Sequence, residues 1–503
     1  PRRFEAEGYE GKFFIGAVAG READGGIDGA SLVDLAPQVR NGRLVWDAPA
    51  GRWRVMKFTW EYTGPKAMQQ KMIAVDGADR ECVEWFLRTV YQPHYDRFRE
   101  DFGKTIRGYF YDEPETPGDW GPEVMKVLAE RGVDWKKALV AWKFRLAGEE
   151  HIAARYQYAD AFAEAWGRTM YGGMSKWCRE RGVRSIGHLM EHGTELFSPR
   201  LCAGNMFQLQ KYSDMGGIDL VCRQYYPGQR ETGFFQMPKL GSSISHAYGK
   251  EDDLAMCEIF GAYGQDLTYS QMKWLTDQMQ VRGINFMIPH SFNPRAPFDT
   301  DCPPYFYNGG FEPRWPLYRV WADYTSRLSL MLHGGRHVAP VAFLFLGQSY
   351  HAGRNLRPDE LTNALDDALY DCDWVPYDAF DEATLEDGEI RLHRERYRIL
   401  IVPAAEVIPY DTLAKARRFF EQGGVVVGYG FLPSKSATIG KTSADIAALV
   451  EAIWGAGASP GLSACKTSAA GGRSYFLPAR PAPEQLKRVF ADAGIYPALE
   501  VLE

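Results

Sequence analysis

The alternation of apolar and polar residues changes about one seventh of the way along the chain. Up to about residue 75 the sequence contains short β-like runs such as Lys12–Val18 and Arg52–Trp60, separated by Gly, Asp and Pro and without helical periodicity. From about residue 76 long amphipathic stretches alternate with short apolar runs, which is typical of parallel β/α architecture. The pattern predicts a β-rich N-terminal segment, residues 1–75, followed by an α/β unit.

Six apolar runs are the candidate strands of this unit: Thr105–Tyr111, Arg184–Met190, Ile218–Gln224, Ser242–Ala247, Leu254–Ile259 and Asn285–Pro289. Lys71–Asp76 is a candidate for another strand. The helices predicted around them include Asp79–Arg99, broken near Pro93, Tyr156–Arg181 and Ser270–Val281. From the alternation and the length we predict a (β/α)8-type TIM barrel over residues 76–335, with an open α/β sheet as the alternative.

A second α/β unit is predicted over residues 336–503, after a helix at Pro316–Leu332 and the Gly334–Gly335 break. Strands are expected at Val341–Leu346, Ile399–Val402 and Gly424–Gly428, and helices at Asp359–Asp371, Tyr410–Gln422, Ser443–Trp454 and Pro483–Ala493. This order is typical of a doubly wound, flavodoxin-like sheet. The irregular segment Pro289–Pro316 is too long for an ordinary connection, and we expect it to form part of a site wall.

Composition and charge exclude several classes of function. Charged residues make up 24% of the 503, and no apolar run approaches the roughly 20 residues that a membrane helix needs. The net charge is −7 and the Lys and Arg residues are scattered, so no nucleic-acid partner is expected. The eight cysteines include no CxxC pair, which argues against a zinc ribbon or a disulfide scaffold. No signal-like segment opens the chain, and we expect a processed or trimmed sequence.

The stretch Gly108–Glu115 (GYFYDEPE) runs from an apolar strand directly into three carboxylates. In barrels the C-terminal ends of the strands carry the active site, so Asp112, Glu113 and Glu115 are candidates. Pro114 forces an extended backbone at Glu113 and predicts an irregular loop there. The alternative is a solvated acidic helix start.

Glu258 is the sharpest single candidate, because it interrupts the apolar run Leu254–Phe260. A lone acid in a buried strand costs several kcal/mol unless it is paired or functional, so an ion-paired core acid is the alternative. Glycoside hydrolysis requires two carboxylates, one to protonate the leaving oxygen and one to activate water or attack the sugar. Glu258 with Glu115 or Glu113 would supply them.

Further polar side chains follow the candidate strands and suit the binding of sugar hydroxyls. They are His188, Glu191, His192, Gln224, Tyr225, His246 and His290. Each histidine alone is more often structural than catalytic, but their shared position after strands strengthens the group. His188 and His192 lack the Glu of a HExxH motif, and no GxSxG, GxGxxG or Walker motif occurs, which argues against zinc catalysis, serine hydrolysis and nucleotide cofactors.

Several of these motifs resemble glycoside hydrolase family 106, the α-L-rhamnosidases. Leu32–Leu35 (LVDL) and Leu44–Arg54 (LVWDAPAGRWR) resemble the stretch ahead of the family's barrel. Ser245–Lys250 (SHAYGK), Met256–Glu258 (MCE) and Met272–His290 are similar to its central barrel stretch. The resemblance covers about residues 30–350, with gaps.

The resemblance implies an inverting, exo-acting glycosidase acting on a glycan or glycoside, with Glu258 as one catalytic carboxylate. Glu115 and Asp112 match the Glu and Asp of the family's Asp-Ser-Tyr/Trp-Glu motif, but this chain reads Asp-Glu-Pro-Glu, so Glu113 competes with Glu115. The family also implies a calcium ion near the sugar, for which no ligand set can be matched, and a periplasmic or secreted location. Residues 338–430 resemble the amidotransferase-like domain of many barrel glycosidases, without its Cys nucleophile.

Two rival functions fit the same residues. One is a retaining barrel glycosidase of the β-galactosidase type, with carboxylates about 5–5.5 Å apart instead of the 6.5–9.5 Å of inverting enzymes. The other is a carbohydrate-binding relative that holds a glycan without turnover. Binding that survives removal of Glu258 would favour the second.

Overall fold

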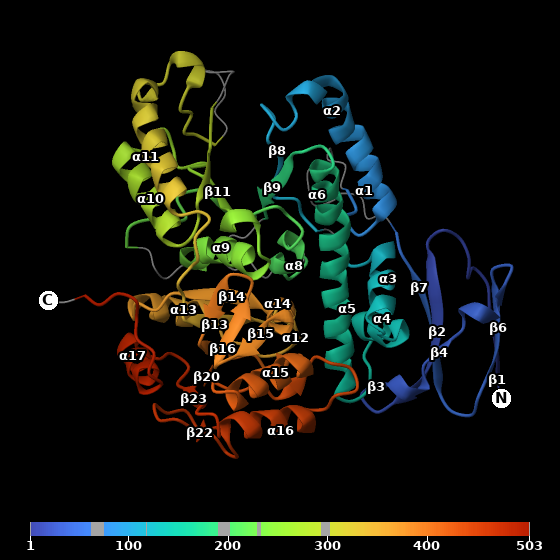
Figure 1. Cartoon of the computed structure of the whole chain (residues 1–503). Coiled ribbons are helices and arrows are strands. Elements are labelled where there is room, and N and C mark those ends of the chain that lie inside the picture. Colours follow the sequence, from blue (N-terminus) through green and yellow to red (C-terminus); the bar gives the residue numbers. More distant parts are fainter. Residues whose placement is uncertain are drawn as a thin grey trace.

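The computed structural model describes residues 2–61, 75–116, 118–189, 202–228, 233–292 and 302–501. Three regions follow one another along the chain in Figure 1: N-terminal strands, a central region of alternating strands and helices, and a C-terminal sheet flanked by helices. None of the helices in these ranges combines the length and the apolar character of a membrane span.

The N-terminal region consists of two small antiparallel sheets. One has the order β1 (Arg2–Ala6), β6 (Arg43–Ala48), β5 (Val39–Arg40), and the other has β3 (Gly26–Ile27), β2 (Phe14–Ala23), β4 (Val33–Asp34), with β7 (Trp53–Thr59) paired to β2. Alternate residues of β6, Leu44 and Trp46, are buried in one core with Ala17 and Ala19 of β2. The β-rich segment predicted from the sequence is confirmed.

Five parallel strands form the frame of the central region: β8 (Gly108–Asp112), β9 (Arg184–His188), β10 (Gly216–Leu220), β11 (Ala255–Ile259) and β12 (Phe286–Pro289). A Cβ added to Gly217 would lie 1.9 Å from the carbonyl oxygen of Gly187, so β9 and β10 are close neighbours. Five predicted strands are therefore confirmed. Within the described residues no strand joins β12 back to β8, and most of the candidate strand Lys71–Asp76 lies outside them.

The helices of the central region largely match the expected ones. They are α1 (Arg80–Phe86), α2 (Gln92–Phe98), α3 (Pro122–Glu130), α4 (Trp135–Lys143), α5 (Glu150–Trp166), α6 (Gly172–Arg179), α8 (Met206–Gln210), α10 (Tyr269–Val281) and α11 (Tyr318–Met331). The predicted break near Pro93 is a π-helical turn, Leu87–Tyr91, between α1 and α2. Proline has no backbone N–H, so a carbonyl oxygen in the preceding turn loses its usual hydrogen-bond donor. A widened turn is one way for a helix to continue past such a position.

The prediction of a strand at Ser242–Ala247 is wrong, because these residues end helix α9 (Met237–Ala247). All eleven residues of α9 are buried, with Gly, Ser and Ala on several sides. The predicted strand covered only six residues, and an apolar run that short cannot be told from a segment of a buried helix by its pattern alone. The short apolar run was therefore mistaken for a strand.

The C-terminal region is a six-stranded sheet with the order β14 (Cys372–Pro376), β13 (Val341–Phe345), β18 (Ile399–Val402), β20 (Val425–Tyr429), β23 (Arg473–Leu477), β22 (Lys466–Thr467). All pairs are parallel except the last, and the five parallel strands follow the flavodoxin-like order 2-1-3-4-5. Its flanking helices include α13 (Pro358–Asp367), α15 (Tyr410–Glu421), α16 (Ser443–Trp454) and α17 (Pro483–Asp492). A small antiparallel sheet, β15 (Thr384–Glu386), β16 (Glu389–Leu392) and β17 (Glu395–Tyr397), adjoins it.

The central and C-terminal regions share one hydrophobic core. In Figure 1 helices α8 and α9 lie directly above β13 and β14, and α9 packs against β14. Phe207 of α8 and Phe345 of β13 have ring centroids 4.7 Å apart, and both are fully buried. The C-terminal region therefore supports the frame that holds the strand ends.

Candidate active site

The C-terminal ends of four consecutive parallel strands each carry one ionisable side chain. Asp112 ends β8 beside His188 of β9, and Asp219 of β10 lies opposite Glu258 of β11 in the strand register. Because parallel strands end at the same edge, the four side chains gather there. These four residues are called the strand-end cluster below.

His188 is the centre of the strand-end cluster. Its side chain is 1% exposed, and its Nε2 lies 2.9 Å from Oε2 of Glu258 and 3.5 Å from Oδ1 of Asp112. Its Nδ1 faces the carbonyl oxygen of Leu189 at 3.4 Å. A carbonyl only accepts hydrogen bonds, so the hydrogen bond to Leu189 requires a proton on Nδ1. The contact between Nε2 and the carboxyl group of Glu258 requires a further proton, on one of these two atoms. The geometry suits transfer of a proton between the ring and the carboxyl group.

Asp112 lies at the open side of the strand-end cluster, with 73% of its side chain exposed. Its surroundings raise the pKa of its carboxyl above the usual value, first through partial burial of the group and then through the charges of Glu258 and Asp219. The nearby histidines His188 and His290 act in the opposite direction. Carboxylates this close repel one another when ionised, and at Asp112 this repulsion adds to the effect of burial.

Glu113 lies beside the strand-end cluster in an unusual backbone conformation. Its φ is 42°, a left-handed conformation that non-glycine residues rarely adopt, so the extended backbone predicted from Pro114 is wrong, although the segment is an irregular loop as expected. Its carboxylate lies within 4.8 Å of ligand atoms of His188 and Asp219. Among the described residues it is therefore Glu113, and not Glu115, that joins such a group. Glu115 is half-buried two residues further along the same loop.

The remaining predicted site residues fall into three sets. His290 and Gln224 follow β12 and β10, and the Nδ1 and Oε1 atoms of these two side chains are buried without a hydrogen-bond partner in the described residues. Such atoms are suited to a polar ligand. Glu191 and His192 lie outside the described residues. The third set, Tyr225 and His246, lies away from the strand-end cluster.

Tyr225 is placed in a side pocket and not at the strand ends. Its ring stacks on Phe235 at 5.5 Å, and its hydroxyl lies 3.5 Å from Gln278 of α10 and accepts a hydrogen bond from Arg282. With Trp274 and other residues it lines a cavity of about 230 Å³. Tyr225 lies five residues beyond the end of β10, and its side chain packs toward α10.

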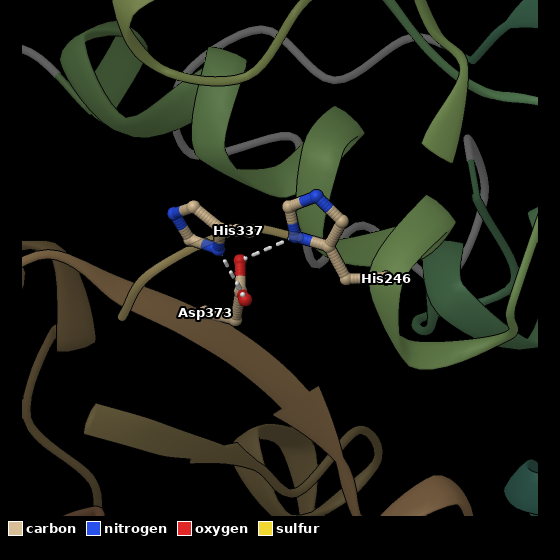
Figure 2. Close-up of side chains that lie close together, drawn as sticks. All are labelled: His246, His337 and Asp373. Carbon is tan, nitrogen blue, oxygen red and sulfur yellow. Dashed lines mark hydrogen bonds and ion pairs between the residues drawn. The ribbon is translucent and has the colours of Figure 1, made fainter. Parts of the chain in front are cut away.

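His246 is on helix α9 and not at a strand end, which corrects its predicted place. Its Nδ1 lies 2.9 Å from Asp373 of the C-terminal sheet, as Figure 2 shows. The correction follows from the wrong strand at Ser242–Ala247, since a helical His246 faces β14.

Sequence reasoning missed Asp219, although the signal was present. Asp219 interrupts the apolar run Gly216–Leu220 in the same way that Glu258 interrupts β11, and it is 5% exposed. A buried acid inside a strand needs a partner or a function. A carboxylate inside an apolar run is the feature that identified Glu258, and Asp219 has the same feature.

The sequence carries the signature of a known family along almost its whole length. A family model described as alpha-L-rhamnosidase, that of glycoside hydrolase family 106, matches residues 12–501. The chain belongs to glycoside hydrolase family 106. This confirms the resemblance read from the motifs, which covered only about residues 30–350. A search of curated proteins returned no match.

Solved structures show where the family 106 fold recurs. A rhamnosidase from Novosphingobium sp. PP1Y is 22% identical and superposes with a TM-score of 0.72, over 94% of this chain and 45% of its own. A catalytic mutant of Gan42B, a GH42 beta-galactosidase from G. stearothermophilus, is 12% identical with a TM-score of 0.59, over 84% of this chain and 73% of its own. The beta-galactosidase from the psychrophilic Marinomonas ef1 is 14% identical with a TM-score of 0.52, over 84% and 76%.

These identities are low, so the structural matches establish an α/β fold shared with glycosidases and nothing about substrate. The chain spans 45% of the length of the rhamnosidase that it matches. Its own activity is therefore treated as a proposal.

Proposed function

We propose that this family 106 chain hydrolyses the bond between a terminal α-L-rhamnosyl residue and the rest of a glycan or glycoside. The observation that carries the proposal is the contact between Glu258 of β11 and the buried His188 of β9, at the C-terminal ends of these strands and beside further carboxylates. Family membership supports rhamnose as the sugar. The proposal includes a complete eight-stranded (β/α) barrel, supported by the order of the five parallel strands.

Glu258 is assigned the role of general base. A hydrogen bond from Nε2–H of His188 fixes the orientation of its carboxylate toward a water molecule. The general acid is then Glu115, which matches the Glu of the family motif, with Glu113 as the alternative because it lies beside His188 and Asp219. Asp112 and His290 are assigned to the sugar hydroxyls.

In the proposed step the acid gives its proton to the glycosidic oxygen as the bond from that oxygen to the anomeric carbon breaks. Water bonds to the anomeric carbon from the opposite face, and Glu258 takes the proton that water loses. The products are free rhamnose of inverted anomeric configuration and the released alcohol. A retaining, β-galactosidase-type reaction would instead preserve the configuration, which proton NMR of the first-formed sugar distinguishes.

The calcium ion of the family does not fit the described residues well. Calcium prefers six to eight oxygen ligands. Two groups of described residues at the strand ends could hold a metal. One consists of His188 with Asp112 and Glu258, and the other of His188 with Glu113 and Asp219, so each offers one nitrogen and only two carboxylates. These residues do not form an oxygen cage, and no step of the reaction is assigned to calcium.

The decisive experiment measures hydrolysis of nitrophenyl glycosides and of plant or bacterial polysaccharides by the wild type and by Glu258→Gln, Glu115→Gln and Glu113→Gln. We expect rhamnose release by the wild type, and a loss of roughly 10²–10⁴-fold in kcat for Glu258→Gln and for one of the other two variants. Glu251→Gln is the matched control, since Glu251 is 67% exposed and pairs with Arg184. Full activity of Glu258→Gln would refute the assigned base, and binding without turnover by the wild type would favour a carbohydrate-binding relative.

A further inference from the structure

A second cluster of ionisable side chains lies between the central and C-terminal regions, away from the strand ends. Figure 2 shows His246 of α9 and His337, from the segment between α11 and β13, on two sides of Asp373 of β14. The Nδ1 atoms of His246 and His337 lie 2.9 and 3.0 Å from the two carboxylate oxygens of Asp373. His246 and Asp373 are 4% and 1% exposed. The three residues therefore present two nitrogens and a carboxylate to one enclosed point.

Glu395 of β17 is a buried carboxylate next to His337. Its side chain is 1% exposed, and its Oε2 lies 3.8 Å from Nδ1 of His337. Neither of its carboxylate oxygens has a hydrogen-bond partner in the described part of the chain. A buried carboxylate without partners is costly, and in native structures such a group commonly faces an ion or a water molecule. The orphaned oxygens of Glu395 indicate a missing cation.

The side chains around His246, His337 and Asp373 hold these residues in position, as the outer layer of a metal site does. Nε2 of His337 lies 2.6 Å from Asp371, which leaves Nδ1 to face the cluster. The hydroxyls of Tyr397 and Ser243 donate to Asp373 at 2.9 and 3.2 Å. Carboxylates that orient metal-binding histidines in this way are a regular feature of zinc sites.

The charges of the cluster also suit a divalent cation. Lys239, buried beside it, is 2.9 Å from Asp371 and 3.7 Å from Asp373, so its ammonium is paired chiefly with Asp371. That leaves the negative charges of Asp373 and Glu395 to balance a double positive charge. Two imidazole nitrogens and two carboxylate oxygens form a ligand set that zinc accepts.

We propose that His246, His337, Asp373 and Glu395 bind one divalent transition-metal ion of the zinc class, which fastens helix α9 to the C-terminal sheet. The site is closed by protein ligands and lies apart from the strand-end cluster, so the ion is structural and not catalytic. The inference stands independently of the rhamnosidase proposal.

The rival is a cluster held by hydrogen bonds alone. Without a cation, burial opposes a charge on His337, but Asp373 and Asp371 outweigh it and raise the pKa of His337 to about 10. His337 then remains protonated between the two carboxylates. Metal content separates the two arrangements, because only one of them binds zinc.

The test begins with the full chain stripped by a chelator, dialysed and titrated with zinc. We expect one zinc per chain by mass spectrometry of the metal, a higher melting temperature on zinc addition, and X-ray absorption showing two imidazole ligands with bonds of about 2.0–2.1 Å. The strand ends also have two described histidines near their carboxylates, His188 and His290, so the imidazole count is repeated on His188→Gln, where two imidazole ligands should remain. No zinc, or zinc with one imidazole, overturns the proposal.

Variants locate the ion within the chain. Glu395→Gln and His337→Gln should abolish stoichiometric zinc binding, and Asp371→Asn should weaken it about 10–100-fold. His333→Gln, close in sequence but outside the cluster, and His188→Gln should bind zinc as the wild type does. Zinc that persists in both Glu395→Gln and His337→Gln overturns the proposal. If either variant fails to fold, the imidazole count of His188→Gln decides, because a loss of one imidazole there would place the ion at the strand ends and overturn the proposal.

Discussion

At the scale of single residues, His188 is the side chain on which the strand-end cluster depends. It is almost fully buried, it contacts Glu258 at 2.9 Å, and it lies close to Asp112. Histidine is the side chain best suited to exchange a proton near neutral pH. Removal of the ring therefore affects the protonation of the acids around it and their positions at the same time.

The first prediction concerns His188→Gln, which keeps a hydrogen-bond donor near Glu258 but cannot carry a positive charge. We expect kcat to fall about 100-fold with little change in KM, since small misplacements of a reacting group cost that much. The acidic limb of the pH–rate profile should move to higher pH, because the charge of His188 lowers the pKa of Asp112 and this effect is lost in the variant. Ser349→Ala, buried in the C-terminal region, serves as a control for small losses of packing. A lower rate with an unshifted pH profile would mean that His188 is only structural.

The second prediction concerns the thiol of Cys222, which follows β10 and is exposed. Burial of the sulfur, followed by the charges of Asp219 and Glu113, raises the pKa of this thiol. We expect slow alkylation by iodoacetamide at pH 7, faster alkylation at higher pH, and faster alkylation in Asp219→Asn at any given pH. Rhamnose should slow the reaction if it occupies the strand ends. Equal alkylation rates in the wild type and Asp219→Asn would show that the charge of Asp219 does not act on the thiol of Cys222.

At the scale of elements, the strand ends are held in place by close backbone contacts between neighbouring strands. Gly217 of β10 allows β10 to approach Gly187 of β9, because no side chain lies between them. Asp219, two residues further on, owes its position to this approach. A substitution far from the reacting atoms can therefore disturb the site.

The third prediction is that Gly217→Ala lowers the free energy of unfolding by about 1–3 kcal/mol, as expected when a methyl group is forced into a packed position. A Cβ at Gly217 would lie 1.9 Å from the oxygen of Gly187, whereas a Cβ at Gly335 meets nothing within 4 Å. Gly335→Ala is therefore the matched control and should change stability little. Urea denaturation followed by circular dichroism measures both. A neutral Gly217→Ala would show that β9 and β10 are not in tight contact.

Several helices and most strands of the central region were predicted close to where the structure places them. Helices α10 and α16 and strands β8, β9, β10, β11 and β12 were found within a few residues of their observed bounds. Two errors lie at the same interface. Helix α9 was taken for a strand, and strand β14 (Cys372–Pro376) was not predicted because it follows α13 after only a short turn. Both are buried by a partner far away in the sequence, and a local pattern carries no information about such a partner.

The site was predictable to the extent that strand ends were. Asp112, Glu113, His188 and Glu258 were identified because each follows or interrupts an apolar run, and the structure brings them together. His246 was misplaced because part of helix α9 was taken for a strand, and Tyr225 because the direction of a side chain beyond a strand depends on the packing of the next helix. The contact between His188 and Glu258 joins residues 70 positions apart, which no spacing rule reveals.

At the scale of the whole molecule, the central and C-terminal regions behave as one packed body. A single cluster of buried side chains extends through both of them, and Phe207 and Phe345 meet across the boundary. Interfaces of this kind resemble a domain core more than a contact between mobile domains. The two regions should therefore lose their structure together.

The fourth prediction is that Phe345→Ala lowers the free energy of unfolding by about 3–5 kcal/mol and keeps a single calorimetric transition. Phe345 is fully buried in the C-terminal sheet, so loss of its ring weakens the core that both regions share. Leu330→Ala is the control, because Leu330 is 70% exposed. Two separate transitions in Phe345→Ala would show that the regions unfold independently.

The complete burial of α9 has a consequence for the order of events during synthesis. The helix leaves the ribosome before β13 and β14, the strands that cover its second side, because about 100 residues separate them from it. During that interval the nascent chain carries an uncovered surface of small and apolar residues, with Lys239 and His246 not yet paired with Asp371 and Asp373. A pause in translation between residues 250 and 376 would prolong this exposure and favour aggregation. Production of this protein in a foreign host should therefore benefit more from chaperones, or from slow growth at low temperature, than from a strong promoter.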